Sequence, residues 1–216
     1  MRTRTRTAAL AWVDEGTARC ATVLAGLSEE EYAAPSALPG WTRKHLVAHL
    51  AANAEAVGNL IRWAHTGEPT PMYASPEERA AGIAKGPRLS GAELTGWFMA
   101  SAARLAAAMD ALSDAAWQAE VVTAQGRTVP AEETPYLRAR EVLVHAVDLA
   151  TGLTFADLPA DFLRELEADI RARRGPGAVP EVAGPRAQIV AYLAGRPATG
   201  VTTADGSTPP ALPAWL

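Results

Sequence analysis

The chain has 216 residues, of which 49% are hydrophobic and 20% are charged, and its formal net charge is -4. This composition is that of an ordinary globular protein, and the acidic balance gives no electrostatic reason to expect nucleic acid or an anionic membrane as a partner. No run of about 18 apolar residues is present, so no membrane span is expected. The single cysteine, Cys20, excludes an intramolecular disulfide and suits a cytoplasmic protein, because thiols stay reduced there.

The helical periodicity of the apolar residues predicts four long helices before residue 152. Thr42 is placed to act as the N-cap of the second helix, and Gly67 stops that helix. Ser90 is placed to cap the third helix, and Pro135 suits the first turn of the fourth. Such a set of helices predicts an antiparallel four-helix bundle. The expected helices cover residues 5–27, 42–66, 92–112 and 134–151.

Shorter elements are expected between these helices. Residues 69–91 are rich in proline, glycine and charge, with a short helix over 76–83. Residues 118–122 and 127–129 flank Gln125-Gly126, which is a weak hairpin signal. The connections are therefore expected to carry only small amounts of regular structure.

The pattern of predicted elements changes after the fourth helix. Residues 158–174 predict a fifth helix that closes in the breaker Gly175-Pro-Gly177. The last segment of about forty residues is too short for a secure core of its own, so it is expected to pack on the bundle. The expected fold class is therefore mainly α, with a metal-binding bundle domain over residues 1–174 and a small C-terminal α/β extension over residues 175–216. In that extension, strands are expected over 179–182 and 200–203, and a helix over 185–194.

Three side chains on two of the expected helices could form a metal site. Glu141 and His145 are four residues apart, which places them on one face of the fourth helix, although such a pair is more often simply hydrogen-bonded. His49 has apolar neighbours in the second helix and should point inward, whereas His45 is expected nearer the solvent and His65 at the helix end. A set of two imidazoles and one carboxylate leaves a fourth zinc position open, as in catalytic sites. Buried, hydrogen-bonded histidines are the alternative.

The sequence resembles a known family in several segments. Residues 35–53 and 138–149, together with Pro71-Met-Tyr-Ala-Ser75, are similar to the mycothiol-dependent maleylpyruvate isomerases, which belong with the DinB-like four-helix bundle metalloproteins. The closing residues 209–216 are similar to that family's C-terminal end. The likeness covers most of the expected bundle, and it implies a DinB-like fold.

The resemblance also implies roles for particular residues. The family's zinc ligands correspond to the histidine of the second helix and to the Glu and His of the fourth, which are the three residues named above. Arg79 lies where the family has an arginine near the site. Arg196 is the candidate for a C-terminal arginine that the family uses, although the C-terminal part is short here, and Arg186 is the alternative. A solvated arginine past a helix end is an equally common fate for Arg196.

The activity that the resemblance implies is an isomerisation that depends on zinc and mycothiol. The mycothiol thiolate would add to the cis double bond of maleylpyruvate, the resulting single bond would rotate, and elimination would give fumarylpyruvate. Zinc would lower the thiol pKa. Arg79 and Arg196 would bind the carboxylates of this dianionic substrate. Asp148 is a candidate to orient His145, although capping or surface exposure is the commoner fate of such an aspartate. Trp41 and Tyr73 are candidates to line the pocket, although Trp41 could equally pack at a helix start.

Two alternatives to the isomerase stay open on the sequence. A mycothiol S-transferase acting on electrophilic small molecules would use the same metal and thiol but would stop at the adduct. A non-catalytic metal-binding module would need neither thiol nor substrate. For either enzyme, the expected partners are a low-molecular-weight thiol and a small dicarboxylate or electrophile, with no nucleic acid and no membrane, in a monomer or homodimer.

Overall fold

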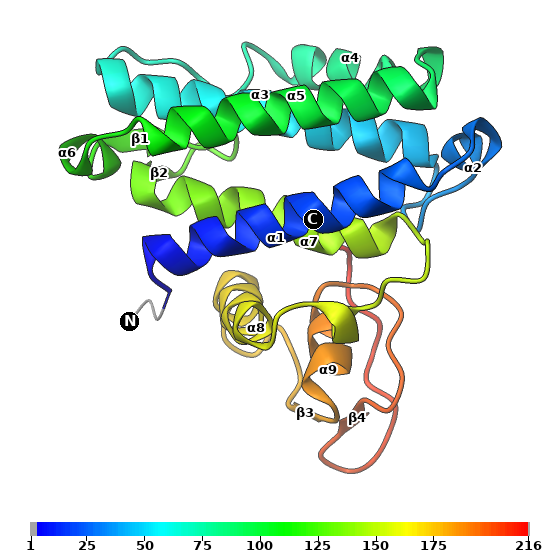
Figure 1. Cartoon of the computed structure of the whole chain (residues 1–216). Helices are drawn as coiled ribbons and strands as arrows, with labels where there is room; N and C mark the ends of the chain where they lie inside the picture. The colour runs from blue at the N-terminus through cyan, green and yellow to red at the C-terminus, as the bar shows by residue number, and fades with distance from the viewer. Residues whose placement is uncertain (1–3, 216) are drawn as a thin grey trace. The chain divides into compact units, whose positions relative to one another are not determined.

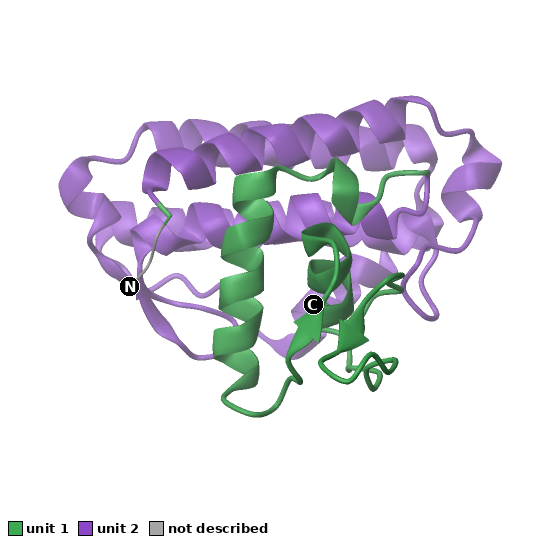
Figure 2. Cartoon of the chain, turned by 90° about the horizontal axis from the view of Figure 1, so that it is seen from below, with its two compact units in different colours: residues 1–4, 152–216 green, residues 5–151 purple. Residues whose placement is uncertain are grey.

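The structure is a computed structural model that describes residues 4–215. The described residues divide into two compact units, one formed by residues 5–151 and the other by residues 152–215 with residue 4 (Figure 2). The elements of the larger unit are α1 (Arg6–Ala25), α2 (Glu29–Ala33), α3 (Arg43–Thr66), α4 (Pro76–Ala84), η1 (Gly86–Arg88), α5 (Gly91–Asp110), α6 (Asp114–Trp117), β1 (Glu120–Val122), β2 (Thr128–Pro130), η2 (Ala131–Glu133) and α7 (Thr134–Asp148).

The larger unit is the expected bundle of α1, α3, α5 and α7 (Figure 1). Helix α1 packs along α7, and α3 packs along α5. Lys44 at the start of α3 donates a hydrogen bond of 2.7 Å to the carbonyl of Leu89, just before α5, so these two helices run in the same direction. Arg43 at the start of α3 donates to the carbonyl of Leu149 at the end of α7, so α3 and α7 are antiparallel. Trp12 of α1 lies beside Tyr136 of α7, and Cys20 beside Val142, so α1 and α7 also run in the same direction. The bundle is thus parallel within each pair and antiparallel between the two pairs.

The ends of α3 follow the signals in the sequence. Thr42 is the N-cap, and its Oγ1 lies 2.8 Å from Nδ1 of His45 in a reciprocal capping arrangement. Gly67 ends the helix in the left-handed conformation, at φ 77°, which glycine adopts without a steric penalty. His45, in the first turn of α3, therefore takes part in capping the helix, whereas His49, one turn later, is buried.

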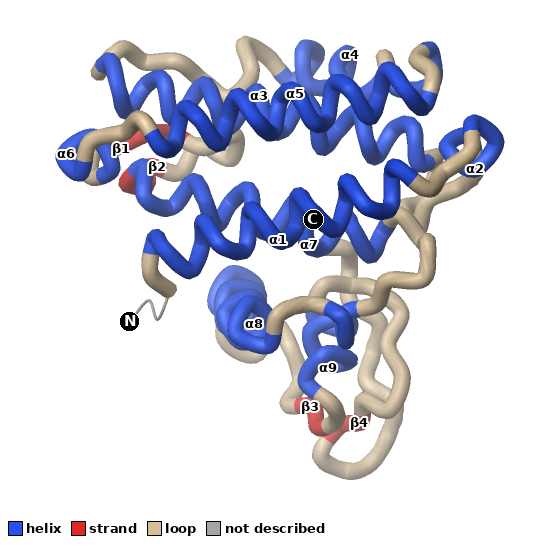
Figure 3. Tube along the Cα trace, in the orientation of Figure 1, coloured by secondary structure: helices blue, strands red, loops and turns tan. Residues whose placement is uncertain are grey.

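One hydrophobic cluster of the bundle lies between α3, α5 and the β1–β2 hairpin. The hairpin is antiparallel, with Val121 opposite Val129, and both of these side chains are buried. Figure 3 shows the two short strands at one end of the long helices. The buried residues of this cluster are Ala54, Val57, Leu60, Ile61, Ala64, Leu105, Met109, Leu112, Trp117, Val121, Val129 and Ala131.

Gly16 marks a close approach of α1 to α7. A Cβ atom at this position would lie 2.4 Å from Cγ2 of Val142 and 3.0 Å from Cγ of Leu143. Valine is stiff at χ1, so the helices would have to separate. We expect Gly16→Ala to lower the free energy of unfolding by about 1–3 kcal/mol, the usual cost of overpacking, as measured by urea denaturation.

Gly96, on α5, is the matched control for Gly16. It also lies inside a helix, but an added Cβ would meet nothing within 4 Å. Gly96→Ala should therefore raise the free energy of unfolding by about 0.5–1 kcal/mol, since alanine is the better helix former. If Gly16→Ala were equally stabilising, α1 and α7 would not be in the contact described.

The smaller unit contains η3 (Phe155–Asp157), α8 (Ala160–Arg174), β3 (Val182–Ala183), α9 (Arg186–Leu193) and β4 (Thr202–Thr203). Helix α8 packs against α9, and β3 pairs antiparallel with β4. The hydroxyl of Tyr192 donates to the carbonyl of Pro210 at 2.9 Å, and Arg174 donates to that of Pro213 at 2.6 Å, so the proline-rich tail is held in this unit.

The two compact units divide between Thr151 and Gly152, which is earlier than the boundary at residue 174 expected from the sequence. The difference arises because α8 makes its contacts with α9, so it is grouped with the extension. The assignment of domains stays a prediction. Within residues 4–215, no helix is long and apolar enough to cross a membrane.

Candidate metal centre

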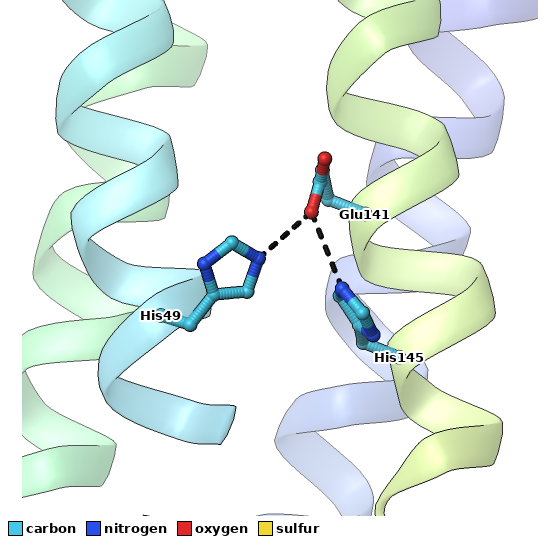
Figure 4. Close-up of side chains that lie close together, drawn as sticks. All are labelled: His49, Glu141 and His145. Carbon is cyan, nitrogen blue, oxygen red and sulfur yellow. Dashed lines mark hydrogen bonds and ion pairs between the residues drawn. The ribbon is translucent and has the colours of Figure 1, made fainter. Parts of the chain in front are cut away.

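His49 of α3 and Glu141 and His145 of α7 converge between the two helices (Figure 4). Oε2 of Glu141 lies 2.9 Å from Nε2 of His49 and 3.3 Å from Nε2 of His145. One ligand atom from each of the three side chains lies within 4.8 Å of the others. The structure therefore brings together the set that the sequence singles out.

The three side chains reach one point because of the helix geometry. Glu141 and His145 are one turn apart on the face of α7 that packs against α3. His49 is 5% exposed and His145 is 3% exposed, so both imidazoles are withdrawn from solvent. Their rings are nearly perpendicular, at 84°, with centroids 5.1 Å apart. The rings of Trp41 and His49 are packed edge to face, with centroids 5.7 Å apart and an interplanar angle of 64°, so this tryptophan lies beside the centre.

The arrangement fits a divalent metal. Two ligand atoms that are each about 2.1 Å from a tetrahedral zinc ion are separated by about 3.4 Å. The spacing of 3.3 Å between Glu141 and His145 matches this value, and the spacing of 2.9 Å between Glu141 and His49 needs only a small adjustment. Two imidazoles and a carboxylate are also the donor set of catalytic zinc sites with an open position, although they suit other divalent metals as well.

Asp148 fixes the orientation of one imidazole. Its Oδ2 lies 2.8 Å from Nδ1 of His145, and its side chain is fully buried. A carboxylate on the far nitrogen of a metal-binding histidine sets the tautomer and makes the ligand more basic. The contact leaves Nε2 of His145 directed at Glu141. Asp148 therefore orients a candidate ligand and does not stand free at the helix end.

The protonation of the three side chains follows from burial and mutual contact. Burial raises the pKa of Glu141, but the hydrogen bonds and charges of His145 and His49 outweigh burial, and the pKa lies well below its usual range. Burial lowers the pKa of His49, with partial compensation from Glu141. Burial also disfavours the charge on His145, but Asp148 and Glu141 raise its pKa to about 8. Glu141 is therefore an anion, and His49 is a neutral candidate ligand.

Metal binding should depend on pH through His145. Because its pKa is about 8 in the metal-free protein, a metal ion must displace a proton from this histidine at neutral pH. We expect zinc affinity to fall about tenfold per pH unit between about pH 7.5 and pH 6, as measured by competition with a chromophoric chelator. Asp148→Asn removes a cause of the raised pKa, so the fall should begin at a lower pH. An affinity that is flat over this range would contradict the assignment.

Arg79 and Tyr73 interact electrostatically with the metal centre. Burial raises the pKa of Tyr73, which also responds to the charges of Arg79 and Glu141 and to a hydrogen bond with Arg79. The positive charge of Arg79 contributes to the lowered pKa of His49. Arg79 and Tyr73 both line one cavity of about 660 Å³. An arginine and a tyrosine of this cavity are thus within electrostatic range of the candidate site.

The C-terminal arginines lie in the smaller unit. Arg196 follows α9, is 9% exposed, and donates from Nη1 to the carbonyl of Ala194 at 2.8 Å. The alternative, Arg186, has a 53% exposed side chain, and its Nε lies 3.4 Å from Glu167. Catalytic roles for Arg79, Arg196 and Arg186 stay predictions.

Arg138 is a buried cation near the site that the sequence interpretation did not single out. It is 0% exposed, and its Nη1 donates to the carbonyl of Leu50 at 2.7 Å and to Oδ1 of Asn53 at 2.8 Å. Burial lowers its pKa to about 10, while the negative charge of Glu141 favours the cation. The signal in the sequence was its spacing, because a residue three positions before Glu141 shares its helix face.

The fold and the centre define a class of protein, a helical bundle with a candidate metal site between facing helices. The family model of the mycothiol maleylpyruvate isomerase N-terminal domain matches residues 13–150. A crystal structure of a mycothiol-dependent maleylpyruvate isomerase is 41% identical, with a TM-score of 0.92 and 98% of each chain covered. A histidine-to-alanine mutant of such an isomerase is 40% identical, with a TM-score of 0.91 and the same coverage. No curated protein matches the chain. The chain belongs to the mycothiol-dependent maleylpyruvate isomerases, an enzyme family.

Proposed function

We propose that the protein is a zinc- and mycothiol-dependent isomerase that converts maleylpyruvate to fumarylpyruvate in the cytoplasm. The observation that carries this proposal is the convergence of His49, Glu141 and His145 in a chain that resembles such an isomerase over 98% of its length. These three side chains would hold the metal, and their open fourth position would accept a thiol. The proposed partners are this thiol and a small dicarboxylate.

The thiol must come from a co-substrate. A zinc ion at this centre would lower the pKa of a bound thiol, so that the nucleophilic thiolate predominates at neutral pH. The protein's own cysteine does not serve, because Sγ of Cys20 is buried and donates to the carbonyl of Val142 at 3.3 Å. Burial raises the pKa of Cys20 to about 12, so it stays a neutral thiol. Reversible thiol addition makes the substrate's double bond temporarily single, which permits rotation.

The arginines would bind the two carboxylates of the substrate. Guanidinium groups bind carboxylates through two parallel hydrogen bonds, which fixes orientation as well as charge. Arg79 is suited to this role because its charge acts on His49 of the metal centre and it contacts Tyr73. We propose Arg196 as the second arginine, since a dianion is best held by two cations. Asp148 would keep His145 in its ligand orientation throughout.

The experiment that tests this function follows the products by mass and by geometry. Zinc-loaded protein with mycothiol should convert maleylpyruvate to a product of equal mass with a trans double bond, and mycothiol should be regenerated. A stable product that is heavier by the mass of mycothiol would show that the protein is an S-transferase and not an isomerase. If neither substrate nor thiol changed, the protein would be a non-catalytic metal-binding module and the proposal would be abandoned.

A further inference from the structure

A large cavity lies between the α3–α4 connection and the β1–β2 hairpin. It has a volume of about 660 Å³. Three hydrogen bonds hold its walls together. Nδ2 of Asn59 lies 3.3 Å from the carbonyl oxygens of Pro71 and Met72, and the backbone N–H of Ala124 donates to Sδ of Met72 at 3.2 Å. The lining includes Trp63, Pro71, Met72, Tyr73, Arg79 and Thr123.

Two residues of the cavity wall lie within electrostatic range of the metal centre. Arg79 and Tyr73 both line the cavity; the charge of Arg79 acts on His49, and that of Glu141 acts on Tyr73. A ligand in the cavity could therefore extend past these two side chains toward the three candidate metal ligands. A thiol held at the open metal position needs such a neighbouring space for the rest of its molecule.

We propose that this cavity binds the sugar and inositol body of mycothiol and presents the thiol to the metal centre. The inference rests on the proposed function and adds the location of the co-substrate. The volume lies within the range of about 300–1,000 Å³ that is usual for small-molecule sites. It exceeds what a short dicarboxylate requires, whereas a thiol carried on two six-membered rings would fill it.

The chemistry of the lining favours a neutral polyhydroxylated ligand over the dianionic substrate. Trp63, Tyr73 and Pro71 offer flat apolar surfaces that suit the C–H faces of sugar rings. Thr123 and the Tyr73 hydroxyl add polar groups at a few points, as is typical of ligand pockets. Among the described residues that line the cavity, Arg79 is the one cation. Two carboxylates could not both be paired there, whereas mycothiol carries none.

The test fills the cavity from an exposed position. Ala124→Trp places a bulky side chain in the lining and keeps the backbone contact to Met72. The matched control is Ala103→Trp, an equal change at an exposed position of α5 outside the cavity. The probe is S-methylmycothiol, whose sulfur cannot become a thiolate, and its Kd is measured by calorimetry on zinc-loaded protein. Kinetics give the KM of each substrate, and thermal melting checks the fold.

We expect Ala124→Trp to raise the Kd of S-methylmycothiol and the KM of mycothiol by about tenfold or more. The KM of maleylpyruvate should stay within about twofold, and the control should change neither constant. Ala74→Trp, at a second exposed position in the lining, gives the same test should the first variant melt early.

Three outcomes would overturn the assignment of the cavity: an unchanged Kd in a folded filled variant, a rise confined to the KM of maleylpyruvate, or wild-type protein that does not bind the probe. The test is separate from that of the isomerase activity. Wild-type protein that binds the probe through the cavity but leaves maleylpyruvate unchanged would contradict the proposed function and not the cavity assignment. Isomerase activity together with a probe Kd that is unchanged in Ala124→Trp and Ala74→Trp would contradict the cavity assignment and not the proposed function.

Discussion

Glu141→Gln is expected to abolish tight zinc binding and to lower isomerase turnover by more than about a hundredfold, since changes to outer-shell partners alone cost about 10–100-fold. Oε2 of Glu141 contacts both imidazoles, and the side chain is the only anion of the His49, Glu141 and His145 set. A glutamine is neutral and binds zinc weakly. Its amide can still hydrogen-bond the imidazoles, so the helices should stay packed. Zinc content by atomic absorption and turnover by absorbance measure the two effects.

Glu55→Gln is the matched control for this variant. Glu55 is an exposed residue of α3, and it accepts hydrogen bonds from two residues of α5, Arg104 at 2.9 Å and Trp97 at 3.0 Å. These contacts are exposed, so their loss should cost less than about 1 kcal/mol and leave zinc and turnover unchanged. Full zinc content in Glu141→Gln would show that the zinc binds elsewhere in the protein.

Arg138→Ala is expected to lower the free energy of unfolding by about 3–5 kcal/mol, because it leaves the buried Oδ1 of Asn53 without this donor and leaves a cavity. The carbonyl of Leu50 and Oδ1 of Asn53 would each lose a charged donor in a region closed to water. An unpaired buried acceptor costs about 1–3 kcal/mol. Urea denaturation of metal-free protein isolates this effect from zinc binding.

Two further variants separate the hydrogen bonds of Arg138 from its bulk. Arg104→Ala removes an arginine whose side chain is 62% exposed, and it should cost less than about 1 kcal/mol. Arg138→Met combined with Asn53→Leu removes the donor and the side-chain acceptor together, and should recover part of the loss. If Arg138→Ala cost no more than Arg104→Ala, Arg138 would not be the buried hydrogen-bonding centre described.

The long helices could be predicted because periodicity and caps agree over many residues. Thr42, Gly67 and Ser90 stand at the helix ends that their chemistry favours. Helices α2 and α6 were not predicted, since five and four residues are too few to show a period. The capping box between Ser28 and Glu31 was the available signal for α2.

The direction of α5 relative to α3 could not be predicted from the sequence pattern. Periodicity shows that a segment is helical and which face is apolar, but it does not give the path of the connection before it. Here residues 67–90 return along α3, and Lys44 fixes their end through the carbonyl of Leu89. That contact spans 45 residues, and no local signal encodes it.

The candidate site was predictable where spacing determines it. The i,i+4 relation joins Glu141 to His145, and the apolar neighbours of His49 indicated that it points inward. The orienting role of Asp148 depended on its burial, which distinguishes it from a helix cap. The importance of Arg138 depended on the packing of α3 against α7. The arginines proposed to bind substrate stay predictions.

We propose that the centre formed by His49, Glu141 and His145 holds one zinc ion on which the thiol-dependent isomerisation depends. The most direct measurement is to strip the protein of metal, add zinc in steps, and follow maleylpyruvate conversion with mycothiol present. Activity should rise linearly and stop at about one zinc per chain, with none in the absence of mycothiol and none in Glu141→Gln. Full activity in metal-free protein, or activity in Glu141→Gln equal to that of the wild type, would contradict the claim.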